Sequence, residues 1–289
     1  MYNAYFGFSE APFSLSPDPA FFYRSEQHEE ALANLVYGVQ ARKGFIVLTG
    51  EVGTGKTTML ECLRDYLETQ YIEFAFLFNS RINTDQFFEM IAYDLNLPCA
   101  RTSKTEVLFA LNQLLVEQAQ DSRTVVLIVD EAHNLEWEVL EEIRLLGNLE
   151  NRHGKLLQIV LAGQPEFDRK LDAPNLRQLK QRVVLRCALE PFTLRDATEY
   201  INSRLEKAGM PNQAIFSEEL LADIHLRSRG IPRVINAICD NLLLTAFAQE
   251  EKVCTRAMLD EVCNDMRLEW PGMRRSLRVA NESFDRSAY

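Results

Sequence analysis

The stretch of sequence with the clearest chemistry is residues 50–57, which match the pattern G-x-x-x-x-G-K-[ST]. Glycines let successive backbone N–H groups turn inward around a phosphate, and the N-terminus of a following helix adds the positive end of its dipole. In this pattern the lysine reaches the β- and γ-phosphates of a nucleotide, and the last hydroxyl binds Mg²⁺. The stretch therefore predicts a site for ATP and Mg²⁺. Its residues are Gly50, Glu51, Val52, Gly53, Thr54, Gly55, Lys56 and Thr57, with Thr58 next to them.

Two adjacent carboxylates, Asp130 and Glu131, follow the five apolar residues 125–129. Such an apolar run is typical of a buried strand in a parallel sheet, and ligands of open α/β sheets bind at the carboxyl ends of the strands. We therefore expect Asp130 to hold Mg²⁺ and Glu131 to polarise the water that attacks the γ-phosphate. The alternative is that both are solvated acids at the start of a helix.

The same segment, residues 130–133, spells Asp-Glu-Ala-His, which is also the box of a helicase superfamily. A second RecA-like domain of such helicases does not fit in a chain of this size, so we disfavour a helicase. His133 is accordingly interpreted as a packing or surface residue rather than a catalytic one.

Apolar periodicity predicts the elements that must position these residues. The expected strands are residues 45–49, 73–78, 124–129, 156–162 and 183–187. Helices are expected at 25–42, 56–70, 84–96, 105–120 and 136–149, with short helices before residue 180. Strands that alternate with helices favour a mostly parallel sheet with crossover helices.

The pattern changes after residue 190, where only helices are expected, at 193–207, 217–227, 232–248 and 255–268. Residues 1–24 are rich in aromatic side chains and contain three prolines, which favours an extended arm over a helix. The predicted organisation is an N-terminal arm (1–24), an α/β nucleotide-binding domain (25–190), a helical domain (191–270) and a flexible tail (271–289).

Composition limits the classes of partner. The chain has 31 basic and 42 acidic residues, a formal net charge of −11, which disfavours non-specific binding to nucleic acid. Residues 169–186 are a local exception, with six basic residues and one acidic residue. The six cysteines lack metal-ligand spacing, which predicts reduced thiols in a cytosolic protein. No apolar run approaches the roughly 20 residues of a membrane-spanning helix, and no secretory signal opens the sequence, so we expect a cytoplasmic location.

With these motifs in hand, the chain resembles the AAA+ ATPases, in particular the ExeA-type (general secretion pathway A) ATPases and the related ATPases of exosortase and exopolysaccharide loci. The likeness covers about residues 1–268. It rests on residues 5–8, 12–19 and 23–32, on the glycine-rich loop, and on residues 160–166 with their Ala-Gly-Gln-Pro-Glu segment. It implies an α/β P-loop fold whose parallel sheet is flanked by helices, a small helical lid domain, ATPase activity and assembly into a homo-oligomer.

The resemblance also assigns roles within one subunit. It implies that Gln164 senses the γ-phosphate and that Arg233 is a second sensor; Arg233 could instead be a surface arginine at a helix start. Asn79 is either a polar partner that restrains Glu131 or a turn residue at a strand end. Residues 12–28 are expected to pack on the adenine, with backbone contacts near 21–23, or to serve as a hydrophobic strap.

Between subunits, the resemblance places an arginine finger in the basic segment of residues 169–186. Arg182 is the first candidate for a finger that enters the neighbouring subunit's site, and Arg177 and Arg186 compete with it. The alternative is that the whole segment is a solvated basic face.

Three functions stay open at this point. The first is an oligomeric ATPase that assembles or remodels a secretion or exopolysaccharide envelope system with protein partners. The second is a DNA-transaction ATPase similar to transposition regulators, and the third is a scaffold gated by nucleotide without turnover. ExeA-type proteins carry a membrane helix and a peptidoglycan-binding domain after the ATPase, and this sequence shows neither up to Tyr289. Direct contact with the cell wall is therefore unsupported, and the sequence favours a cytosolic ATPase associated with such a locus.

Overall fold

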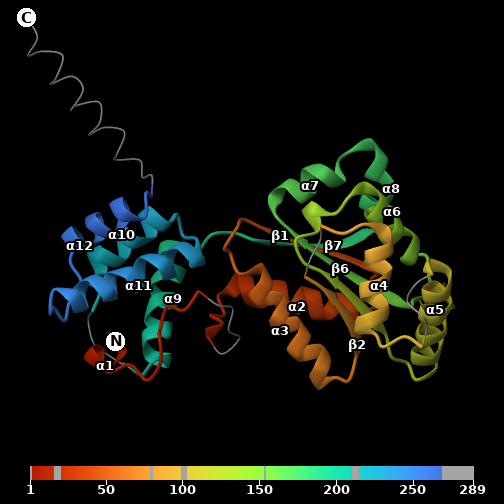
Figure 1. Cartoon of the computed structure of the whole chain (residues 1–289), viewed down its shortest axis with the longest axis horizontal. Helices are drawn as coiled ribbons and strands as arrows, with labels where there is room; N and C mark the ends of the chain where they lie inside the picture. Colours follow the sequence, from red (N-terminus) through yellow and green to blue (C-terminus); the bar gives the residue numbers. More distant parts are fainter. Residues whose placement is uncertain are drawn as a thin grey trace, which may run out of the picture. The chain divides into compact units, whose positions relative to one another are not determined.

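The computed structural model describes residues 2–15, 21–78, 81–98, 103–152, 154–209 and 215–268. The chain forms two compact units (Figure 1). The α/β unit is Asp18–Glu190, and the helical unit combines Met1–Pro17 with Pro191–Tyr289. Three sequence features lie outside the described residues, namely Asn79, Cys99 and the predicted tail at 271–289.

The α/β unit is built on a five-stranded parallel sheet with the strand order β2-β3-β6-β1-β7. The strands are β1 (Phe45–Gly50), β2 (Glu73–Leu77), β3 (Val125–Val129), β6 (Leu157–Gly163) and β7 (Val183–Leu189). Every residue of β1, β3 and β6 is buried, as the continuous apolar runs predict for inner parallel strands. The predicted parallel α/β fold is confirmed.

Helices cover both faces of this sheet (Figure 1). Because successive strand residues point to opposite faces, Val47 and Leu127 belong to one core and Ile46 and Val126 to the other. The second core is closed by α2 (Glu26–Gln40) and α3 (Lys56–Thr69). The first is closed mainly by α4 (Thr84–Asp94), α5 (Lys104–Gln120), α6 (Trp137–Leu146), α7 (Pro165–Leu171) and α8 (Arg177–Lys180).

Strand β7 is longer than the sequence indicates. The expected strand ended at residue 187, but Ala188 and Leu189 continue the pairing with Thr49 and Gly50 of β1. This extension brings the backbone of Leu189 against the start of the glycine-rich loop. A two-stranded antiparallel hairpin of β4 (Glu150–Asn151) and β5 (Gly154–Lys155) was not expected, and it follows α6, which ends at Leu146 rather than at residue 149.

The helical unit consists of α1 (Tyr2–Phe6), α9 (Leu194–Lys207), α10 (Glu218–Ser228), α11 (Pro232–Ala248) and α12 (Arg256–Asp265). The sequence prediction of an extended arm over 1–24 is wrong for residues 2–6, which form a helix. The prolines begin only at Pro12, so they do not break this first turn. Burial of Phe6, a hydrogen bond from Tyr2 to Asp240 of α11, and the Lys252 ammonium 3.4 Å from the Tyr5 ring centroid hold α1 in place.

No helix in the described part of the chain is both long and apolar enough to span a membrane.

Candidate functional site

The glycine-rich loop connects the carboxyl end of the central strand β1 to the first turn of α3. Gly53 and Gly55 have φ values of 85° and 100°, in the left-handed region that glycine adopts without steric cost. A Cβ on Gly50 would lie 2.6 Å from Thr54 Oγ1 and 2.8 Å from the carbonyl oxygen of Leu189. The loop therefore needs glycine at these three positions, two for conformation and one for space. Glu51 and Val52 form its exposed tip.

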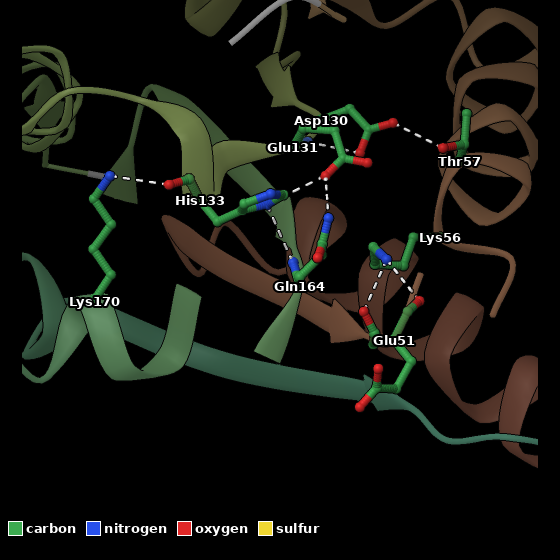
Figure 2. Close-up of polar contacts among 9 residues, drawn as sticks. Glu51, Lys56, Thr57, Asp130, Glu131, His133, Gln164 and Lys170 are labelled. Carbon is green, nitrogen blue, oxygen red and sulfur yellow. Dashed lines mark hydrogen bonds and ion pairs between the residues drawn. The ribbon is translucent and has the colours of Figure 1, made fainter. Parts of the chain in front are cut away.

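Lys56 folds back over this loop (Figure 2). Its Nζ donates to the carbonyl oxygens of Gly50 at 2.8 Å and Glu51 at 3.0 Å, and the residue is only 5% exposed. Burial lowers the pKa of Lys56, and the surrounding carboxylates of Glu131, Asp130, Glu51 and Glu166 oppose that effect. The ammonium group is thus held over the loop by two uncharged carbonyl acceptors, which a charged phosphate could replace.

Asp130 and Thr57 meet at the end of β3 (Figure 2). The hydroxyl of Thr57 donates to Asp130 Oδ2 at 2.9 Å, and the backbone N–H of Glu131 donates to Oδ1 at 2.8 Å. Burial raises the pKa of Asp130, and these two hydrogen bonds oppose it. A hydroxyl and a carboxylate side by side are the hard oxygen ligands that Mg²⁺ prefers, so the residues fit the metal that the loop motif implies.

Glu131 has a left-handed backbone with φ 52°, which a residue with a Cβ rarely adopts. Its Oε2 lies 3.2 Å from His133 Nδ1 and 3.5 Å from Gln164 Nε2, and its side chain is 40% exposed. Gln164 comes from the residue that follows β6 and precedes α7. The structure therefore brings Glu131 and Gln164 together beside Asp130, although 33 residues separate the first two in sequence.

Two histidines that the sequence analysis did not single out for this site lie against its residues. His133, interpreted as packing or surface, lies against Glu131 with a side chain that is 15% exposed. His28 is 3% exposed in α2; its Nδ1 lies 2.6 Å from Ser25 Oγ and its Nε2 lies 3.4 Å from the carbonyl oxygen of Thr54. A signal for His28 was available, because it shares the apolar face of α2 with Ala31 and Leu35 and so had to be buried.

The three finger candidates lie on or before β7. Arg182 precedes β7 at the end paired with Phe45, whereas Gly50 pairs with Leu189 at the other end, about 20 Å along the strand. Arg182 donates to the carbonyl oxygen of Arg144 at 2.7 Å and to Asn148 Oδ1. Arg186 pairs with Asp168, and Arg177 is exposed.

Two further predictions concern a second sensor and the adenine contact. Arg233 is exposed in the first turn of α11, in the helical unit. The turn before it places Gly230 at φ 72° against Phe192, whose N–H donates to the Gly230 carbonyl at 2.8 Å. In the segment expected to meet adenine, Phe22 packs edge-on against His28 with ring centroids 5.6 Å apart.

Comparison with known proteins shows the family of this chain. The family described as "AAA domain" matches residues 39–171. General secretion pathway protein A of Aeromonas hydrophila is 47% identical over 251 residues, which is 86% of this chain. The match covers 45% of that relative, so the chain spans less than half the length of the curated protein it matches.

Three solved structures share the fold. Cdc6p from Pyrobaculum aerophilum has a TM-score of 0.68 at 20% identity, over 91% of this chain and 70% of that protein. The ADP form of ORC2 from Aeropyrum pernix has a TM-score of 0.66 at 14% identity, over 89% of this chain and 73% of that protein. The RuvB Holliday junction branch migration motor of Thermotoga maritima has a TM-score of 0.56 at 14% identity, over 85% of this chain and 70% of that protein. At these identities the likeness shows the fold alone.

Proposed function

Since this chain is an AAA domain protein with the P-loop fold, we propose that it binds ATP together with Mg²⁺ and hydrolyses the bond between the β- and γ-phosphates. The observation that carries the proposal is the meeting of a phosphate loop and a carboxylate pair at one edge of the sheet. Thr57 bonds to Asp130 at 2.9 Å, and the charges of Asp130 and Glu131 act on Lys56 (Figure 2).

In this proposal the loop from Gly50 to Thr57 surrounds the phosphates, and Lys56 exchanges its two carbonyl partners for phosphate oxygens. Such charge-assisted bonds are about twice as strong as neutral ones, which gives the exchange its driving force. Thr57 and Asp130 would hold Mg²⁺, which supplies positive charge to the phosphate oxygens when bound.

Glu131 is the proposed general base. Its carboxylate would accept a proton from the attacking water or polarise it, and the side chain is 40% exposed to solvent. Gln164, whose amide lies 3.5 Å from the same carboxylate, is proposed to contact the γ-phosphate. Arg233 as second sensor, and the segment 12–28 as the adenine contact, remain predictions from the family resemblance.

The position of Arg182 supports the homo-oligomer that the family resemblance implies. Because Arg182 lies at the far end of β7 from its own loop, it can contribute to hydrolysis only in a neighbouring subunit. We propose a ring or filament in which each site receives Arg182, or else Arg177 or Arg186, from the next copy.

The cellular role is proposed from the relative whose name places it in the general secretion pathway. We infer a cytoplasmic ATPase that couples turnover to assembly or remodelling of a secretion or exopolysaccharide system, with protein partners. A DNA-transaction role is less favoured. Four of the six basic residues in 169–186 are engaged within the α/β unit, by ion pairs at Lys180 and Arg186 and by carbonyl or amide oxygens at Lys170 and Arg182.

The test is phosphate release from ATP and Mg²⁺ by the full chain, compared with its Glu131→Gln variant. The amide keeps the size of the side chain but cannot act as a base, so turnover should fall about 10²–10⁴-fold while ATP affinity stays within a few-fold. Addition of duplex DNA should leave the rate unchanged. Equal rates for both proteins would remove Glu131 from the mechanism, and strong stimulation by DNA would favour the DNA-transaction role.

A further inference from the structure

His133 occupies a constrained place between the proposed base and the residue after β6. The backbone turns sharply at Glu131 and continues into the 3₁₀ turn η2 (Ala132–Asn134), where the N–H of Asn134 donates to the Glu131 carbonyl at 2.9 Å. This turn folds the imidazole back over the carboxylate two residues earlier. His133 Nδ1 lies 3.2 Å from Glu131 Oε2 and 3.4 Å from the backbone nitrogen of Gln164 (Figure 2).

One ring nitrogen faces two groups with opposite requirements. The N–H of Gln164 is a donor and needs Nδ1 as an acceptor, whereas the Glu131 carboxylate is an acceptor and needs Nδ1 as a donor. A single nitrogen cannot serve both at once. Which of the two groups it bonds to depends on which ring nitrogen carries the proton, and the ring lies against both groups in either state.

The backbone of His133 is fixed independently of its ring. Lys170, on α7, donates from Nζ to the carbonyl oxygen of His133 at 3.0 Å (Figure 2). The same Nζ also donates to the carbonyl oxygen of Leu135. The segment that starts at Gln164 and continues into α7 therefore contacts both the ring and the main-chain carbonyl of His133. A histidine fixed in this way can limit the rotation of a neighbouring side chain that is 40% exposed.

We propose that His133 is a positioning residue, which holds the Glu131 carboxylate at a set place relative to Gln164 and the bound γ-phosphate. The inference rests on the proposed function, in which Glu131 acts on the attacking water. It assigns His133 no contact with nucleotide. Displacement of a reacting group by about 1 Å costs about 100-fold in rate, so loss of the ring should lower turnover about 10–100-fold.

The experiment compares four variants of the full chain in ATP affinity and in single-turnover hydrolysis with Mg²⁺. The variants are His133→Ala, His133→Asn, Glu131→Gln and the double variant Glu131→Gln/His133→Ala. Asn134→Ala is the control, because Asn134 is exposed in the same turn. Melting curves show whether each variant is folded.

His133→Ala should keep ATP affinity within about twofold and lose turnover. His133→Asn should recover most of the rate, because the asparagine amide can place a donor or acceptor near the position of Nδ1. If His133 acts through Glu131, the double variant should hydrolyse no more slowly than Glu131→Gln alone.

Three results would overturn the proposal: wild-type turnover in His133→Ala, an Asn variant no faster than the Ala variant, or a double variant slowed by the full product of both single effects. The last would indicate a structural role. A Glu131→Gln variant with wild-type turnover would instead remove the proposed base itself, so the two failures are distinguishable.

Discussion

The two ends of the paired strands β1 and β7 carry different kinds of cationic side chain. At the carboxyl end, Lys56 bonds to carbonyls of its own loop at 2.8 and 3.0 Å and is surrounded by four carboxylates. At the amino end, Arg182 donates to the Arg144 carbonyl of α6 and to Asn148, which follows that helix. At the carboxyl end, side chains from several elements lie close together around the glycine-rich loop. At the amino end, Arg182 is bound by neighbouring groups of its own unit.

This difference indicates which groups work within a single chain. Lys56, Thr57 and the carboxylates of Asp130 and Glu131 meet at the carboxyl end, whereas Arg182 lies at the opposite end of β7. Arg182 is 38 residues from Arg144 in sequence and ties the start of β7 to the end of α6. Its role is therefore either to hold α6 or to serve a second copy of the chain, and the predictions below separate the two.

The largest effect is expected from Arg182→Ala. A finger supplied by a neighbour is worth about 10³–10⁵ in rate, so turnover should fall by that factor. ATP affinity should stay the same, because the finger stabilises charge that develops in the transition state. Steady-state turnover and ATP titration check this, and wild-type activity per molecule should rise with protein concentration.

Lys180→Ala is the control for Arg182, because Lys180 lies in the same segment and pairs with Asp172 on the surface. A mixing experiment separates action within one chain from action on a neighbour. Arg182→Ala has an intact phosphate loop and Lys56→Ala has an intact finger, so the two should recover partial activity together. Without recovery, and with turnover independent of concentration, Arg182 serves only to hold α6.

The next largest effect is expected at the other end of the strands, from Lys56→Ala. Loss of two charge-assisted bonds to phosphate, at about 1.5–3 kcal/mol each, should weaken ATP binding by about 10²–10⁴-fold. Calorimetry with ATP and Mg²⁺ measures this affinity. Lys104→Ala, which removes a surface pair with Glu142, should bind ATP as the wild type does. Unchanged affinity in Lys56→Ala would contradict the assignment of the phosphate loop.

A smaller effect is expected from His28→Leu, which keeps the apolar bulk of the side chain. The change removes the contact with the Thr54 carbonyl at 3.4 Å and the bond with Ser25 at 2.6 Å. One hydrogen bond of about 1–1.5 kcal/mol corresponds to a loss of about tenfold in ATP affinity through a less ordered loop. His28→Gln, which retains a polar nitrogen near Nε2, should recover part of it. Wild-type affinity in His28→Leu would show that the histidine only packs.

The fold and the phosphate loop were predictable because their signals are local. Strand, loop and helix follow one another within residues 45–69, and five apolar residues before Asp130 suffice to indicate a buried strand. Element ends were less predictable. The sequence alone did not show that β7 continues to Leu189, because that extension depends on pairing with Thr49 and Gly50, about 140 residues earlier.

By itself, the sequence determined the chemical types in the site: a lysine and a threonine after glycines, and two acids after a strand. Only the tertiary structure decided which other residues contact them. Strand order places β6 beside β3 and β1, and this brings Gln164 to Glu131 and His133, whereas packing of α2 brings His28 to Thr54. The physical reason is the separation in sequence between the residues that make contact. Spacing along the chain sets backbone conformation and the face on which a side chain lies, but a contact between distant segments depends on which elements the fold makes neighbours.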